Sequence, residues 1–218
     1  MLKFFDSDSP LMRTLGTMAE LMILNVLTIL CSIPIVTMGA AVTALYDAVW
    51  RLQQGEAKLT HAYFAAFKSN FKKATILWLI YLPLGVVLVA NFYTAFTKDT
   101  SLFATIFSLF GMMWWVFAIS WVFPLQSRFE NTLWGTFKNS LLFPLGYFPR
   151  TLGMAVLNAL PWALLIEPVY FSMGGPVWLF LYFALAAHLN LKLLGKPFDR
   201  FFAQAAVDEY NEQKQLEE

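Results

Sequence analysis

Two ionisable residues lie inside long apolar runs, where a charge is costly and is therefore a functional candidate. His188 lies in the last run, shortly before Lys192, and Glu167 lies near the end of the preceding run. His188 could take part in proton or ligand binding, but a single His in a span often hydrogen-bonds a neighbouring helix instead. Glu167 could be a proton or cation site. Its expected place near the outer end of a span favours an interfacial carboxylate that reaches water.

Asp47 and Asn158 complete the set of candidate functional residues. Asp47 lies four residues before Arg51, so on a helix the two side chains can form an ion pair. Asn158 lies within an expected span, as do Asn25 and Asn91. Hydrogen bonding between helices accounts for such residues without any ligand.

None of these residues belongs to a pattern with a defined chemistry. The sequence has no HExxH, no paired CxxC, no glycine-rich phosphate loop and no GxSxG. Its only cysteine, Cys31, excludes an intramolecular disulfide. We therefore expect a protein that is not an enzyme, with no catalytic residues, no metal site and no cofactor. A membrane enzyme acting on lipid or glycan has the least support.

The composition indicates a membrane protein. Hydrophobic residues make up 59% of the 218 positions and charged residues 13%, against roughly half and a quarter in soluble domains. The net charge of +1 gives no reason to expect a nucleic-acid partner. The first apolar run follows several charged residues and has no suitable cleavage site after it, so we expect a retained span, not a signal peptide.

The apolar runs predict an all-α, polytopic transmembrane helix bundle with about five spans. One long charge-free stretch, Thr75–Phe96, follows Lys72 and Lys73 and precedes Lys98. At about 1.5 Å per residue it crosses a hydrocarbon core of about 30 Å. We expect one membrane domain over 1–196 and a cytoplasmic amphipathic and acidic tail over 197–218. The predicted spans are 18–36, 75–96, 102–125, 151–171 and 177–194.

Residues 40–53 leave two interpretations open. They follow a break at Pro34 and Gly39 and present several alanines on which another helix could pack. The segment is short and charged for a span. It is either a continuation of a kinked helix or the return arm of a re-entrant hairpin.

Two segments, 60–73 and 128–141, have the aromatic and basic periodicity of amphipathic interfacial helices on the cytoplasmic side. The expected contacts with lipid headgroups are made by lysines, namely Lys68, Lys72, Lys73 and Lys138. A shift of seventy positions aligns the two segments, and each precedes a pair of spans. Either the chain contains a two-fold repeat of helix plus span hairpin, or the likeness is coincidental.

The distribution of the fifteen Lys and Arg residues predicts the orientation. Twelve lie in 51–73, 126–150 and from 192 onward, so these segments and the C-terminus should be cytoplasmic. The loops 97–101 and 173–176 then face outward. Five spans place the N-terminal arm outside; a hairpin over 18–50 places it inside, with fourteen basic residues in the cytoplasm. We expect five spans.

Several stretches together resemble the YesL-like family of bacterial membrane proteins, which has a domain of unknown function (DUF624). They are Asn25–Leu27, Cys31–Ala40, Thr43–Tyr46, Gln54–Glu56, Phe67–Ala74, Phe123–Thr132 and Phe137–Ser140. The resemblance covers about 15–195. It implies a small integral protein of the bacterial cytoplasmic membrane, of a kind often encoded beside carbohydrate-uptake and glycan-degradation genes. It supplies no catalytic or ligand residues.

The first functional expectation is a non-enzymatic accessory component of solute uptake, with carbohydrate as the favoured solute. Its partners would be the lipid bilayer and transporter permease subunits. The alternative is a stand-alone transporter or channel for small solutes, working as a homo-oligomer.

Overall fold

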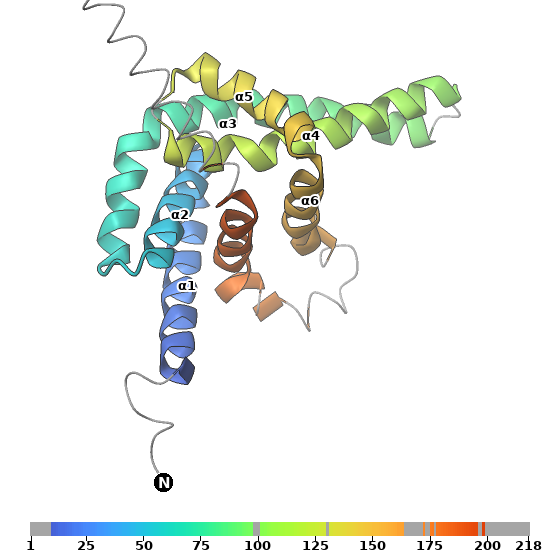
Figure 1. Cartoon of the computed structure of the whole chain (residues 1–218). Helices are drawn as coiled ribbons and strands as arrows, with labels where there is room; N and C mark the ends of the chain where they lie inside the picture. The colour runs from blue at the N-terminus through green and yellow to red at the C-terminus, as the bar shows by residue number, and fades with distance from the viewer. Residues whose placement is uncertain are drawn as a thin grey trace, which may run out of the picture.

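The computed structural model describes residues 10–97, 101–129, 131–163, 172, 175–176, 178–195 and 198. Every regular element in this part of the chain is helical, which confirms the all-α prediction (Figure 1). The elements are α1 (Pro10–Ser32), η2 (Ile35–Thr37), α2 (Met38–Gln53), α3 (Leu59–Thr97), α4 (Leu102–Arg128), α5 (Leu133–Gly146), α6 (Phe148–Ala163) and η3 (Trp178–Tyr182). Leu179–Gly195 forms a further apolar helix, here called the C-terminal helix.

The break after α1 turns the chain back on itself. Pro34 has no backbone N–H to continue a helix, and Thr37 Oγ1 bonds the Cys31 and Pro34 carbonyl oxygens at 2.6 and 2.8 Å. Trp78 Nε1 donates to the Ile35 carbonyl oxygen at 2.7 Å. Figure 1 shows α2 returning beside α1. Residues 40–53 are therefore a return arm and not a continuation of the first helix.

Four helices of the described residues are long and apolar enough to cross a membrane. They are Leu11–Ser32, Ile35–Gln53, Leu59–Thr97 and Leu102–Arg128. Three of them contain the predicted spans 18–36, 75–96 and 102–125, apart from the residues of the turn after Ser32. The return arm over Ile35–Gln53 is an addition that the five-span prediction did not count. The predicted span 151–171 is described only as far as residue 163.

Residues 60–73 do not form a separate interfacial helix, because α3 continues through them without a break. Figure 1 shows α3 rising beside α2 and then turning to run with α4. Ser69 Oγ and Asn70 Nδ2 both donate to the Ala66 carbonyl oxygen, at 3.1 and 3.2 Å. Side chains that bond to helix carbonyls in this way bend helices. The predicted boundary between the interfacial helix 60–73 and the span 75–96 thus lies within one bent helix.

Two prolines lie inside helices and do not end them. Pro124 lies within α4, which continues to Arg128, and Pro144 lies within α5, which continues to Gly146. In membrane bundles, neighbouring groups take up the backbone positions that a proline leaves unpaired. The second predicted amphipathic helix accordingly begins at Leu133 and ends at Gly146.

Helix α2 forms the centre of the bundle, in contact with α1, α3 and α4. Four alanines along it are fully buried, namely Ala40, Ala41, Ala44 and Ala48. A Cβ on Gly39 would lie 2.5 Å from the Ala74 carbonyl oxygen and 2.6 Å from Trp78 Cβ. Such contacts let two helix backbones approach closely, which stabilises helix pairs in lipid.

The distal half of the α3–α4 pair, by contrast, is largely exposed. Figure 1 shows these two helices extending together beyond the rest of the bundle. Their side chains there are apolar and largely exposed; examples are Val86 (62%), Phe96 (75%), Leu102 (75%), Phe103 (79%) and Phe107 (70%). An apolar surface of this extent is incompatible with water and fits a hydrocarbon environment.

Replacing Gly39 with Ala should destabilise the protein by about 1–3 kcal/mol, because the new methyl group meets α3 backbone that cannot give way. The matched control is Gly16→Ala on α1, where nothing lies within 4 Å of the new methyl group. SDS-induced unfolding of the detergent-solubilised chain measures both. Equal stability of the two variants would contradict the close contact between α2 and α3.

Candidate functional site

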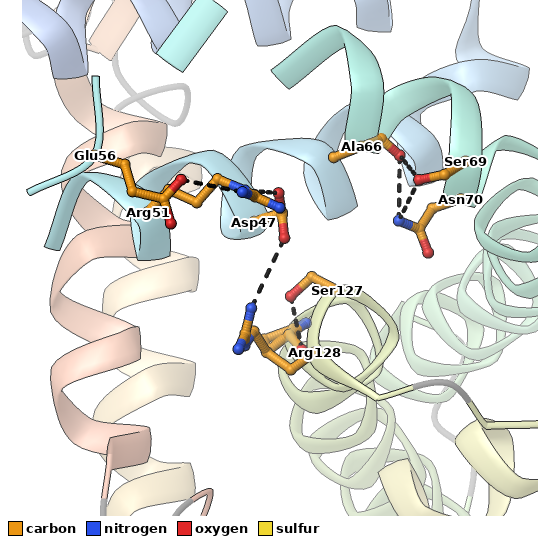
Figure 2. Close-up of polar contacts among 9 residues, drawn as sticks. Asp47, Arg51, Glu56, Ala66, Ser69, Asn70, Ser127 and Arg128 are labelled. Carbon is orange, nitrogen blue, oxygen red and sulfur yellow. Dashed lines mark hydrogen bonds and ion pairs between the residues drawn. The ribbon is translucent and has the colours of Figure 1, made fainter. Parts of the chain in front are cut away.

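One carboxylate joins the ends of α2 and α4. Asp47 Oδ2 pairs with Arg51 Nε at 2.8 Å, and Asp47 Oδ1 lies 3.8 Å from Arg128 Nη1 (Figure 2). The side chains of Asp47 and Arg128 are only 10% and 14% exposed. Arg51 also reaches Glu56 at 3.1 Å. The predicted pair of Asp47 and Arg51 is confirmed, and it extends to a second arginine from a distant helix.

The ring of Trp50 completes the surroundings of Arg128. The guanidinium carbon of Arg128 lies 3.5 Å from the centroid of this ring, a cation–π arrangement. Two guanidinium groups therefore share one carboxylate, and an aromatic face covers one of them. Opposite charges at these distances, largely shielded from solvent, hold the C-terminal ends of α2 and α4 together.

A second polar group crosses the interior of the bundle. Asn190 Nδ2 donates to Tyr46 Oη and to Asn158 Oδ1, both at 2.9 Å. Asn158 Nδ2 in turn donates to Ser120 Oγ at 3.0 Å. The chain of bonds links α2, α4, α6 and the C-terminal helix. Asn158 thus makes the inter-helix bonds that the sequence analysis favoured over ligand binding.

Asn25 behaves in the same way at another helix crossing. Its Nδ2 donates to the Leu179 carbonyl oxygen at 2.8 Å, and its Oδ1 accepts from the Ala184 backbone N–H at 2.9 Å. These bonds attach α1 to the C-terminal helix where the π-helical turn η3 gives way to regular helix. The third asparagine of the prediction, Asn91, is exposed on α3.

A belt of polar contacts ties α5 to α3 and α4. Gln126 donates to Asn70 Oδ1 at 3.1 Å and accepts from Thr136 Oγ1 at 3.3 Å. Tyr81 Oη and Ser140 Oγ lie 2.6 Å apart. The belt places the amphipathic helix α5 across the other two helices.

The predicted headgroup lysines are all exposed. Lys68, Lys72 and Lys138 lie on the outer surfaces of α3 and α5, where they can reach lipid phosphates. Lys73 is exposed as well, and its Nζ donates to the Asn131 carbonyl oxygen at 3.0 Å. This bond holds the segment before α5 against α3.

His188 does not join the polar core. It is half-buried, its backbone carbonyl accepts from Gln53 Nε2 at 2.9 Å, and its Nδ1 is buried without a hydrogen-bond partner in the described part of the chain. It lines an open cavity of about 750 Å³ between α1, α2 and the C-terminal helix. Glu167 lies outside the described residues.

The described groups of the site hydrogen-bond one another and pair charges. Within the described residues, no three His, Cys, Asp or Glu side chains cluster as a metal site would require. The polar core consists of neutral amides and hydroxyls. Its chemistry is that of helix association, or of binding a neutral or weakly charged small ligand.

Comparison with known proteins bears on the N-terminal half of the chain. Residues 21–92 match the family model described as "Protein of unknown function, DUF624". This confirms the family resemblance. The match runs from within α1 to the distal part of α3, and it includes Gly39, Tyr46, Asp47 and Asn70. No curated protein and no solved structure matches the chain. The match covers 72 of the 218 residues, so it shows that this part of the chain is similar to the family; with the apolar helices it is consistent with a membrane protein of the all-α class.

Arg128 and Tyr46 are among the members of the site that the sequence analysis missed. Arg128 was assigned to the basic cytoplasmic side and to a family motif, and Tyr46 only to a family motif. A guanidinium directly after the charge-free run of α4, and a Tyr beside Asp47 on a helix of small residues, were available signals. Neither identifies its partner, because both contacts join helices far apart in the chain.

Replacing Asp47 with Asn should destabilise the protein by about 1.5–3 kcal/mol, because the two arginines lose the charge that they share. Glu56→Gln is the control: Glu56 pairs with Arg51 at the surface, so its loss should cost less than about 1 kcal/mol. Unfolding in SDS compares the variants. If Asp47→Asn lowers the free energy of unfolding no more than Glu56→Gln does, the ion pairs of Asp47 do not stabilise the fold.

Replacing Asn190 with Leu should cost about 1 kcal/mol, since bonds between membrane helices contribute roughly 0.6 kcal/mol each and two are lost. Asn91→Leu makes the same chemical change at an exposed position and should cause no loss. Thermal unfolding in mild detergent measures the difference. Unchanged stability of the Asn190 variant would mean that the polar core serves something other than helix association.

Proposed function

We propose that the protein is a non-enzymatic accessory component of solute uptake that binds a permease subunit within the bilayer. The favoured solute class is carbohydrate, which rests on the DUF624 resemblance. The protein would be a multi-pass protein of the bacterial cytoplasmic membrane with a cytoplasmic C-terminus. The distribution of Lys and Arg supports this orientation.

The observation that carries the proposal is an apolar groove on the distal part of the α3–α4 pair. Its volume is about 530 Å³, and it is lined by Trp78, Leu82, Gly85, Val86, Val89, Ala90, Tyr93 and Trp115. A Cβ on Gly85 would overlap the Trp115 ring, so the floor of the groove is a packed glycine–tryptophan contact. Trp115 Nε1 donates to the Tyr81 carbonyl oxygen at 2.9 Å and is thereby fixed.

A fixed, charge-free groove at membrane depth suits a helix of another protein better than it suits a solute. Sugars and ions need polar groups, and the groove offers almost none. Small and aromatic residues at such a surface favour close packing of a partner helix. The polar side chains of the described bundle are meanwhile used to hold its own helices together.

The test is site-specific photo-crosslinking in native membranes. A photoreactive phenylalanine analogue at Val86, which is 62% exposed in the groove, should capture one polytopic permease subunit that mass spectrometry identifies. The control is the same analogue at Leu30 on α1, 55% exposed but outside the groove. Its adduct with that subunit should be much weaker. Equal capture at both positions, or no adduct with any membrane protein, would refute the proposal.

One observation favours the alternative of a stand-alone transporter. A small cavity of about 70 Å³ adjoins Tyr46, Asn158 and Tyr182 in the interior, and Asn190 Oδ1 beside it is buried without a hydrogen-bond partner in the described residues. Crosslinks at Val86 only to a second copy of the chain would support a homo-oligomer of this kind. Flux into liposomes that contain only this protein, reduced in Asn190→Leu, would then establish it.

A further inference from the structure

We infer that the cavity between α1, α2 and the C-terminal helix binds a phosphate group, most simply that of an acidic phospholipid. This site is distinct from the α3–α4 groove, and it does not depend on the proposed role in uptake. It is also distinct from the surface lysines of α3 and α5. The inference rests on the size of the cavity, the arrangement of its lining and its charge.

The volume is sufficient for a ligand of this class. At about 750 Å³ the cavity lies within the range of small-molecule sites, roughly 300–1,000 Å³. It is open to the outside, so a lipid can enter from the bilayer edge. Its walls come from three separate helices, which places the ligand where it would bridge the N-terminal part of α1 and the C-terminal part of α2.

The lining is divided between polar and apolar residues. Polar and cationic side chains form one part, namely Arg13, Thr14, Thr17, Gln53, Gln54, His188 and Lys192. Apolar side chains form the other, namely Met18, Leu21, Leu52, Leu185 and Leu189. A headgroup phosphate with the first part of an acyl chain matches this division. A purely polar solute would leave the apolar part unused.

The charge of the cavity selects an anion. Arg13 and Lys192 contribute positive charge from two different helices, and among the described residues that line the cavity none is acidic. Lys192 is exposed near the end of the C-terminal helix, where a lysine can reach a headgroup. His188 adds a half-buried ring whose Nδ1 is not used by the described part of the protein.

The test compares lipids retained by the full chain after extraction from mixed vesicles of phosphatidylglycerol and phosphatidylcholine. Native mass spectrometry should show preferential retention of phosphatidylglycerol. Lys192→Gln should reduce that preference about five-fold, the effect of one lysine near an anionic headgroup. The matched control is Lys58→Gln, which removes an exposed lysine from the turn between α2 and α3, outside the cavity lining. It should leave the preference unchanged.

A second arm separates the sources of phosphate. In discs of phosphatidylcholine alone, inorganic phosphate should leave the thermal stability of the protein unchanged if the ligand is a lipid. A stabilisation that Lys192→Gln abolishes and Lys58→Gln retains would instead assign the site to a soluble phosphate compound. The inference fails if the wild type shows neither a lipid preference nor a phosphate effect, or if both lysine variants lose either effect equally.

Discussion

Inside a bilayer, apolar helices gain little by exchanging lipid for one another, so the closeness of their backbones decides whether they associate. In this protein the closeness depends on α2. Because Gly39 has no side chain, the start of α2 approaches the carbonyl oxygen of Ala74 on α3 too closely for a Cβ to fit. The buried alanines that follow extend this approach along the helix. The bundle is thus organised around α2, a helix with small buried side chains, against which α1, α3 and α4 all pack.

The polar contacts depend on this arrangement. Tyr46 and Asp47 are neighbours on α2, yet one bonds Asn190 of the C-terminal helix and the other pairs with Arg128 of α4. Because the small side chains of α2 let its neighbouring helices approach closely, consecutive residues of α2 can contact different helices. The amides and the ion pair therefore specify which helices meet.

The sequence predicted what depends on local pattern. The membrane class, the long apolar helices that become α3 and α4, the break at Pro34 and the pair of Asp47 with Arg51 all follow from composition or from spacing along one helix. Arg128 beside Asp47 and Gly39 against Ala74 do not, because contacts between distant segments leave no periodic signal. The unbroken course of α3 was hidden for a different reason. The exposed lysines before residue 74 would show the same helical spacing whether they lay on a separate surface helix or on the first half of a longer helix. Their spacing therefore could not distinguish the two.

The turn at η2 has a consequence for how the chain enters the membrane. Ile33, Ile35 and Val36 are exposed and apolar at the tip between α1 and α2, and no charged residue lies between Glu20 and Asp47. The stretch over α2 is the least hydrophobic of the four candidate spans, with a mean hydropathy of 1.2 against 1.7 for α1 and 2.0 for α3 and α4. With this low hydropathy, an isolated α2 would partition only weakly into lipid. Joined to α1 by an apolar turn, it can be inserted as the second arm of a helical hairpin. Its burial is completed only when α3 and α4, which also pack against it, have been synthesised, so the hairpin enters the membrane before the helices that bury α2 are in place.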